Sequence, residues 1–160
     1  MTEITEFSHQ FAAGVIELIV PIQQTEFGIS ITLEAQPDLQ DVESYYQHGC
    51  GNFWVAVDGL KVVGSIALLD IGRSQVALRK MFVAKGYRGG EQGIANGLLE
   101  QAIYWCKIKS VTQIYLGTTE QFLAAHRFYE KNGFHEIDKS KLPDTFPVMS
   151  VDTKFYYIRI

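Results

Sequence analysis

The sequence predicts an α+β fold (mixed α/β in looser terms), with a central, mixed and mostly antiparallel sheet of about seven strands flanked by about four helices. Three observations support this prediction. A hairpin signal in the middle of the chain joins consecutive strands that should pair antiparallel. Apolar residues at helical spacing follow and indicate a long helix. A strand-helix-strand crossover comes next, and such a crossover places two strands in parallel.

The length and composition are typical of one ordinary globular domain. The chain has 160 residues, of which 47% are hydrophobic and 20% charged, a composition that excludes intrinsic disorder and a long coiled coil. Neither an internal repeat nor a Pro/Ser-rich linker divides the sequence. We therefore expect residues 1–160 to form a single domain with one core.

The N-terminal part of the chain is expected to form a strand and two helices. A short strand covers residues 3–7, and Ser8 is a suitable N-cap for the helix that follows. That helix should weaken near Pro21, because proline has no N–H to donate inside a helix. The next segment, 23–33, is expected to be irregular or extended, and a second helix should cover 37–46.

The middle of the chain should form three strands. Residues 53–57 are the first, and Asp58-Gly59 is a strong signal for the tight turn of a hairpin. The next strand covers 61–71, and a short loop leads to a third strand at 76–83. Short connections between consecutive strands predict an antiparallel meander.

The rest of the chain alternates between helices and strands. Apolar residues recur every three or four positions through 91–109, which predicts a long helix. Asn132-Gly133 is a suitable left-handed end for a later helix. The remaining expected elements are a strand at 113–117, a helix at 120–131 and strands at 134–138 and 152–160.

The charge balance argues against two classes of partner. Fourteen Lys plus Arg residues against eighteen Asp plus Glu residues give a net charge of -4. Such a field does not favour nucleic acid or an anionic membrane surface, and the sequence has no run of about eighteen apolar residues that could span a bilayer. Two glutamates precede the first apolar run, which is not the pattern of a secretory signal. We expect a cytoplasmic protein with no nucleic-acid or membrane partner.

The residue types that most often bind metals are scattered. Cys50 and Cys106 are far apart and lack CxxC or Cys/His ligand spacing, so we expect two reduced thiols. The four histidines include no pair at positions i and i+4 and have no ligand cluster near them. The sequence therefore predicts no metal site.

The most informative segment is 78–99, which lies between an expected strand and an expected helix. Basic residues fall within ten positions there, at Arg79, Lys80, Lys85 and Arg88, and glycines follow at 86, 89, 90 and 93. A glycine-rich loop at the start of a helix offers an anion unpaired backbone N–H groups and the positive end of the helix dipole. Two interpretations fit this pattern: an anion-binding loop, or a mobile turn with a solvated basic flank.

Two common nucleotide motifs are absent from this segment. The residues after the glycines are Ile94 and Ala95, so the GxxxxGK(S/T) phosphate loop is not present. The dinucleotide fingerprint also fails, because the preceding strand belongs to a meander and does not open a parallel βαβ unit. A nucleotide-binding module is therefore the weaker interpretation of the glycines.

Two blocks of sequence resemble the GCN5-related N-acetyltransferases, whose phosphate loop has the pattern Gln/Arg-x-x-Gly-x-Gly/Ala. Gly93-Ile94-Ala95 matches its end, and Tyr87-Arg88-Gly89 resembles its start. Arg88 lies five residues before Gly93 instead of three, which we interpret as a two-residue insertion carried by residues 90–92. Residues 125–134 resemble the second family signature, A-x-x-(F/L)-Y-x-x-x-G-F, and follow the crossover strand as they do in the family.

The resemblance implies the acyl-CoA N-acyltransferase fold and acetyl-CoA as cosubstrate. The reaction it implies is acetyl transfer to the primary amine of a small molecule or a peptide. The alternative is a CoA-binding regulatory module that has lost turnover. The residues that the resemblance assigns to cofactor binding are Met81, Phe82, Val83, Arg88, Gly89, Gly90, Gln92, Gly93, Ile94, Ala95, Thr118, His126 and Phe128.

The resemblance also implies a catalytic role for Tyr129, which matches the family's general acid; the alternative is that it packs against the cofactor. Many relatives carry a glutamate base on the fourth strand, but Ala77 stands there, and no carboxylate occurs in residues 71–90. Glu26 is the best remaining candidate for a base, although a solvent-facing loop glutamate is the plainer interpretation. The alternatives to a carboxylate from elsewhere in the chain are a chain of water molecules and direct attack by the small neutral fraction of the amine.

The aromatic C-terminal segment, 155–157, should alternate its side chains between the two faces of a strand. One face is expected to pack in the core. The other face lines the acceptor cleft or a contact between two copies, so the sequence is compatible with a homodimer.

Overall fold

The computed structural model describes residues 2–90 and 93–160, which build one seven-stranded sheet with the order β1-β2-β3-β4-β5-β7-β6. The strands are β1 (Thr2–Glu6), β2 (Asn52–Asp58), β3 (Lys61–Gly72), β4 (Gln75–Val83), β5 (Gln113–Thr118), β6 (His135–Ile137) and β7 (Lys154–Arg159). β4 and β5 pair in parallel, and the other neighbouring strands that the structure describes pair antiparallel. The sheet is therefore mixed and mostly antiparallel, as the sequence predicts.

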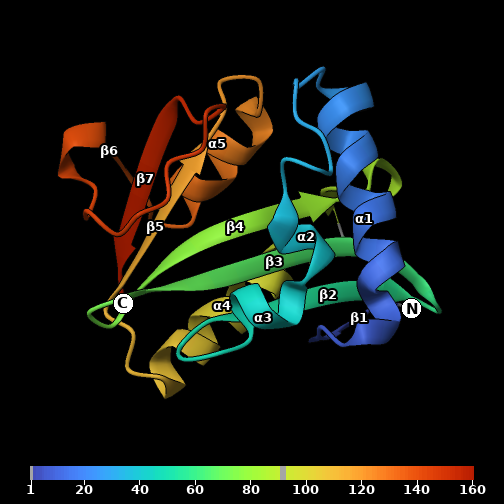
Figure 1. Cartoon of the computed structure of the whole chain (residues 1–160), viewed down its shortest axis with the longest axis horizontal. Helices are drawn as coiled ribbons and strands as arrows, with labels where there is room; N and C mark the ends of the chain where they lie inside the picture. The colour runs from blue at the N-terminus through green and yellow to red at the C-terminus, as the bar shows by residue number, and fades with distance from the viewer. Residues whose placement is uncertain (1, 91–92) are drawn as a thin grey trace.

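Helices cover both faces of this sheet (Figure 1). Those in the described residues are α1 (Ala12–Pro21), α2 (Pro37–Gln40), α3 (Val42–Tyr46), α4 (Ile94–Ile108) and α5 (Leu123–Lys131). Side chains of α1, α2 and α3 pack on one face, whereas those of α4 and α5 share a core with the other. None of the described helices is long and apolar enough to cross a membrane.

The α-helix ends at Pro21, where the sequence predicts that it weakens, but the chain does not become irregular at once. The expected irregular segment is wrong for residues 23–26 and confirmed for residues 27–33. α1 includes Pro21, and a π-helical turn continues over Ile22–Glu26. The N–H of Phe27 donates to the carbonyl of Ile22 at 3.1 Å, which is the five-residue spacing of a widened helix. Proline removes one N–H and crowds the preceding turn, and a wider turn accommodates both effects. Glu26 therefore ends a helical turn instead of lying in an extended loop.

The second expected helix is broken in two at Asp41, whose φ of -152° and ψ of 67° are not helical. The Asp41 carboxylate accepts a hydrogen bond from the N–H of Ser44 at 3.3 Å, so it caps α3. The break explains why the described residues contain one α-helix more than the sequence predicts.

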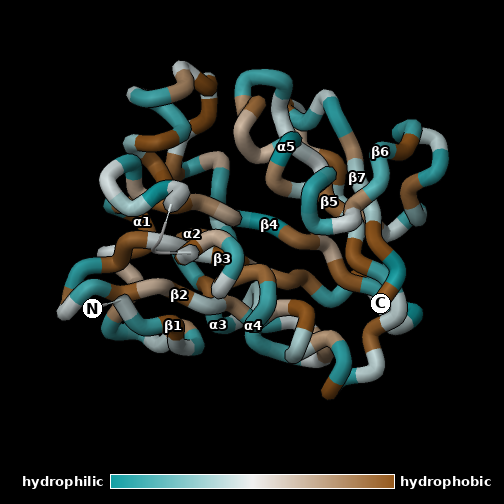
Figure 2. Tube along the Cα trace, turned by 180° about the vertical axis from the view of Figure 1, so that it is seen from behind, coloured by the Kyte–Doolittle hydropathy of each residue, from teal (hydrophilic) through white to brown (hydrophobic). Residues whose placement is uncertain are grey.

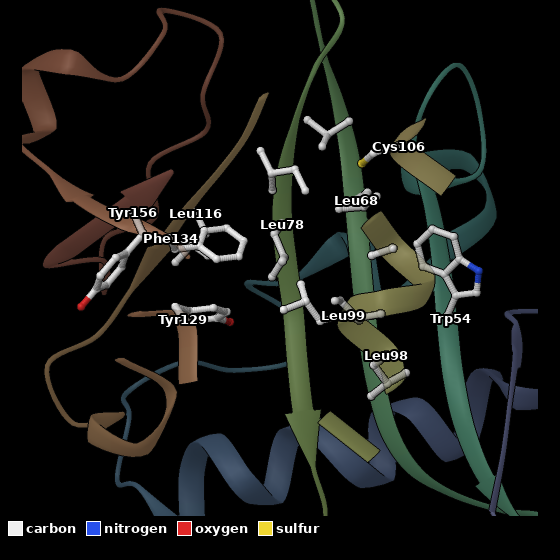
Figure 3. Close-up of a cluster of buried hydrophobic side chains, with 14 of the residues drawn as sticks. Trp54, Leu68, Leu78, Leu98, Leu99, Cys106, Leu116, Tyr129, Phe134 and Tyr156 are labelled. Carbon is white, nitrogen blue, oxygen red and sulfur yellow. The ribbon is translucent and has the colours of Figure 1, made fainter. Parts of the chain in front are cut away.

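Two hydrophobic layers stabilise the molecule, one on each face of the sheet. Trp54, Leu68 and Leu78 of three adjacent strands face Leu98 and Leu99 of α4 (Figure 3). A second layer, which includes Ile19 and Phe53, lies under α1. Figure 2 shows that β2 and β3 are mostly hydrophobic along their length, as expected of strands that are covered on both faces.

β4 and β5 separate soon after they meet. Their pairing joins Gln75–Ala77 to Gln113–Tyr115, and beyond it the two strands diverge (Figure 1). The register of β3 and β4 shifts between the pairs Ser65–Phe82 and Ala67–Arg79, because β4 has one residue more there than β3. Lys80 lies in this bulge and has a φ of 53°. The hydroxyl of Ser65 donates to the Lys80 carbonyl at 2.6 Å and holds this bulge. Because a bulge bends the strand that carries it, β4 turns away from β5 and the sheet opens.

Candidate active site

A cavity of about 560 Å³ occupies the opening between β4 and β5. Its walls come from β4, the glycine-rich segment and the start of α4, the end of β5, α5, and the segment before β7. The sequence-predicted site residues that line it are Met81, Phe82, Val83, Arg88, Gly89, Gly90, Gly93, Ile94, Ala95, Thr118, Phe128 and Tyr129. Gln92 lies outside the described residues. The structure thus brings the two blocks of sequence to one cavity.

The glycine-rich segment leaves room for a ligand at the start of α4. Gly89, Gly90 and Gly93 have φ of 67°, 61° and 59°, and a Cβ at any of them would meet nothing within 4 Å. Gly93 is the N-cap of α4 and provides no side-chain cap. The described residues offer no hydrogen-bond acceptor to the first N–H groups of α4, which point toward the N-terminal end of the helix. An anionic group fits there.

Glu26 and Arg88 form an ion pair in which both carboxylate oxygens contact the guanidinium. Arg88 Nη2 donates to Glu26 Oε1 at 2.7 Å, and Arg88 Nη1 donates to the other oxygen. The bond to Arg88 lowers the pKa of Glu26 below its usual range. Arg88 also donates through Nε to the Val83 carbonyl at 2.7 Å. The pair ties the end of the first helical segment to the loop after β4, and Glu26 is not among the residues that line the cavity.

Tyr129 reaches the cavity from α5. Its ring packs edge-on against Phe134, 5.4 Å between centroids, and its side chain points toward β4 (Figure 3). The side chain is buried, and desolvation raises the pKa of the phenol well above its ordinary value. The phenol is therefore fully protonated at neutral pH and can donate a hydrogen bond or a proton into the cavity.

Thr119 is a polar residue of the cavity wall that the sequence did not reveal. Its hydroxyl oxygen is buried and has no hydrogen-bond partner in the part of the chain that the structure describes. Its carbonyl is 2.8 Å from Nε2 of His126, so the predicted site residue His126 holds the turn between β5 and α5. A buried hydroxyl without a partner in the protein is suited to a hydrogen bond with a ligand or a water molecule.

The basic residues of 78–99 are dispersed, in contrast to the cluster that their spacing suggests. Arg88 pairs with Glu26, and Lys85 is exposed. Arg79 is half-buried on the cavity wall, where its Nη2 donates to Met149 Sδ at 3.1 Å. No carboxylate of the described residues lies within ion-pair distance of Arg79.

Lys80 belongs to a buried polar network on the α2 side of the sheet. Its Nζ lies 3.5 Å from Asp38 Oδ2 and donates to Gln36 Oε1. The Tyr46 hydroxyl donates to the same Asp38 oxygen at 2.6 Å, and Gln23 and Gln36 exchange two hydrogen bonds. Burial lowers the pKa of Lys80 to about 8, against the opposing effect of the Asp38 charge. The network joins α2 and α3 to the bulge of β4.

Comparisons with known proteins relate this chain to acetyltransferases. A model of the acetyltransferase (GNAT) domain matches residues 49–136. N-acetylaspartate synthetase from Danio rerio is 35% identical over 127 residues, which are 76% of this chain and 44% of that protein. The chain spans less than half the length of the first curated relatives that it matches.

Two solved structures share the whole fold. An acetyltransferase of the GNAT family from Staphylococcus aureus Mu50 is 40% identical, with a TM-score of 0.95 over 99% of both chains. The PaiA N-acetyltransferase from Thermoplasma acidophilum, solved in complex with coenzyme A, is 19% identical, with a TM-score of 0.74 over 100% of this chain and 99% of that one. The match of the family model to more than half of the residues, together with a 40% identical relative along the whole length, shows that this chain belongs to the GNAT family of acetyltransferases.

Proposed function

We propose that this protein is an acetyl-CoA-dependent N-acetyltransferase that modifies the primary amine of a small molecule. The observation that carries the proposal is the cavity between β4 and β5, which has the free N–H groups of α4 at one side and charged side chains at the other. One opening through the sheet can therefore hold an anionic cofactor and a second substrate together. The family to which the chain belongs supports the same reaction.

The residues of the cavity fit acetyl-CoA. The N–H groups at the start of α4 and the open backbone at Gly90 and Gly93 suit its pyrophosphate. The unpartnered hydroxyl of Thr119 suits one of its polar groups. When bound, acetyl-CoA supplies an acetyl group activated as a thioester. Glu26 fixes Arg88 on the cavity wall beside Phe27, whose ring centroid lies 5.9 Å from the guanidinium carbon.

Tyr129 is proposed to donate a proton or hydrogen bond to the leaving sulfur. A buried phenol that stays protonated at neutral pH can donate a hydrogen bond or a proton to the thiolate that forms as the thioester breaks. For comparison, the thiol of free cysteine has a pKa of about 8.5. We expect Tyr129→Phe to lower turnover about tenfold or more with little change in the dissociation constant of acetyl-CoA. Rates of thiol release and calorimetric titration measure the two quantities.

Tyr115→Phe is the matched control for this variant. Tyr115 is also buried and stacks on Tyr157, but it does not line the cavity. Loss of its hydroxyl should leave turnover unchanged. Equal turnover in Tyr129→Phe and wild type would remove Tyr129 from the acid role.

The acceptor is proposed to carry a carboxylate beside its amine. Arg79 on the cavity wall contacts a thioether sulfur, so its guanidinium is available to bind a carboxylate through two parallel hydrogen bonds. The name of the Danio rerio relative, N-acetylaspartate synthetase, supports an amino acid of this kind. The geometry favours a small anionic amino acid over an amine that has no carboxylate.

A panel of amines tests both the reaction and the acceptor class. We expect L-aspartate or L-glutamate to release free thiol from acetyl-CoA about tenfold or more faster than L-alaninamide, which has no carboxylate. Mass spectrometry of the amine identifies the acetylated product. If no amine raises thiol release above slow hydrolysis, the inactive CoA-binding module is the better function. If L-alaninamide reacts as well as L-aspartate, the carboxylate preference is wrong.

A cytoplasmic location is also proposed. Cys50 and Cys106 are free thiols, and burial raises their pKa values to about 11 and about 12. Thiols of this kind are stable in a reducing compartment.

A further inference from the structure

Asp152 is an acidic residue in the wall of the cavity. Among the lining residues that the structure describes, it is the one carboxylate, and the cations that share the walls with it are Arg79, Lys80, Arg88 and Lys131. An acceptor amine arrives as an ammonium ion at neutral pH, since free alkylamines have a pKa of about 10.4. Because the other charged side chains of the described walls are cations, an ammonium ion is attracted to Asp152.

Local structure fixes Asp152 with one oxygen free. A turn closes between Met149 and Asp152, where the N–H of Asp152 donates to the Met149 carbonyl at 3.0 Å. The Met149 N–H donates back to Asp152 Oδ2 at 3.0 Å. The other carboxylate oxygen, Oδ1, has no hydrogen-bond partner among the described residues. The turn therefore orients the carboxylate and leaves Oδ1 for a ligand.

The glycine in β5 makes room for this carboxylate beside the opening. A Cβ at Gly117 would lie 2.6 Å from Asp152 Oδ2, so only glycine allows the carboxylate to lie directly against the strand. The pairing of β4 with β5 ends at Ala77 and Tyr115. If it continued for two more residues, Arg79 would lie opposite Gly117. Asp152 and Arg79 thus lie at the two sides of the opening, where β4 and β5 part.

Burial favours a carboxylate that can take up a proton at this position. Desolvation raises the pKa of Asp152, while the Met149 N–H and the charges of Arg79 and Lys80 oppose the rise. A carboxylate with a raised pKa is a better match to an amine than an exposed one. The nearby cations also favour the neutral form of the bound amine.

The remaining candidates for a base are already engaged. Both oxygens of Glu26 contact Arg88, and Nζ of Lys80 is directed to Gln36 and Asp38. Nε2 of His126 is committed to a backbone carbonyl. Tyr129 is protonated and suits the opposite role.

We propose that Asp152 is the residue that deprotonates the acceptor, an inference that rests on the proposed acetyltransferase function. One proton passes from the acceptor ammonium nitrogen to Asp152 Oδ1. The ammonium becomes a neutral amine with a free electron pair, the carboxylate becomes a carboxylic acid, and the proton then leaves to solvent. Asp152 thereby takes the place of the β4 glutamate that is missing at Ala77, which is buried and apolar here.

The pH dependence of Asp152→Asn tests this role. The amide oxygen of the new side chain can still accept from the Met149 N–H, so the turn and the fold should be kept. With L-aspartate as acceptor at pH 7, we expect kcat to fall about 100-fold or more. In the variant, kcat/KM should rise about tenfold per pH unit toward the pKa of the amine, because solution must supply the neutral form. Wild type should be flat over the same range, so that the two converge at high pH.

Asp144→Asn is the matched control, since Asp144 is an exposed carboxylate of the same segment and does not line the cavity. It should keep the wild-type rate and pH profile. A raised KM for L-aspartate with unchanged kcat in Asp152→Asn would show that Asp152 only holds the ammonium, and the proposal would be overturned. A pH profile parallel to wild type would overturn it as well.

A second measurement needs no turnover. Carbon-13 NMR of the side-chain carboxyls, in protein without acetyl-CoA, assigns Asp152 by the signal that disappears in Asp152→Asn. We expect this signal to titrate above the ordinary range of aspartate and to move when L-aspartate is added. An ordinary titration with no response to L-aspartate contradicts the proposal. Absence of turnover with every amine in wild type, by contrast, contradicts the proposed function itself.

Discussion

Gly93→Asp should abolish acetyl-CoA binding in a protein that still folds. Gly93 has a φ of 59° and caps α4 at the wall of the cavity, where an added side chain meets no other atom. Aspartate tolerates the left-handed conformation better than most residues and is a good N-cap, so the fold should survive. Its charge, however, would face the phosphates of the cofactor. Repulsion of several kcal/mol corresponds to a loss of affinity of about 100-fold or more.

Two variants separate charge from backbone strain. Gly93→Asn has nearly the same shape and also tolerates the left-handed region, so it should bind acetyl-CoA better than Gly93→Asp. Gly86→Asp places the same charge in the preceding loop, at a glycine without a positive φ that does not line the cavity, and should bind like wild type. Calorimetric titration with acetyl-CoA measures all three variants. Normal affinity in Gly93→Asp would mean that the phosphates bind elsewhere.

The strands and the glycine-rich wall of the cavity were predictable because local signals specify them. Asp58-Gly59 gives the β2–β3 hairpin its turn, and Gly133, with a φ of 91°, follows the end of α5 as its sequence indicates. Gly89, Gly90 and Gly93 line the cavity because a loop between a strand and a helix has little freedom in where it leads. These features depend on residues close together in the sequence.

The side of the cavity that carries Arg79 and Asp152 was not predictable, because it depends on contacts between distant segments. Arg79 and Lys80 look alike in the sequence, yet Arg79 contacts Met149 on the cavity wall, whereas the bulge turns the Lys80 ammonium toward Asp38. The position of Glu26 depends on a π-helical turn that continues the first helix after Pro21. Asp152 lies in an irregular segment without any periodicity, and only the tertiary fold places it against the glycine of β5.

Lys80→Met should lower the free energy of unfolding by about 3–5 kcal/mol at pH 7. Methionine keeps much of the length of the side chain but removes the cation from Asp38, and both side chains of the pair are only 4% exposed. The Asp38 carboxylate would keep the Tyr46 hydroxyl as partner and lose its counter-charge. Urea denaturation with an unchanged m-value measures the loss. Lys85→Met, the same change at an exposed site, should cost less than about 0.5 kcal/mol.

The double variant Lys80→Met with Asp38→Leu distinguishes a lost pair from lost packing. Replacing both charges by apolar side chains of similar size removes the unpaired carboxylate, so the double variant should be more stable than Lys80→Met alone. If the double variant loses the sum of the two single losses, the charges of Lys80 and Asp38 are not coupled.

The pH dependence of this stability has an unusual sign for a lysine in an ion pair. Burial lowers the pKa of Lys80 from 10.5 to about 8 in the folded chain. Between these two values the unfolded chain binds more protons than the folded chain, so the contribution of Lys80 to stability rises with pH. The difference in unfolding free energy between wild type and Lys80→Met should therefore grow from pH 7 to pH values of about 9.5. A difference that shrinks over this range would mean that attraction to Asp38 outweighs the cost of burying the ammonium, and that the folded chain holds the Lys80 proton more tightly than the unfolded one.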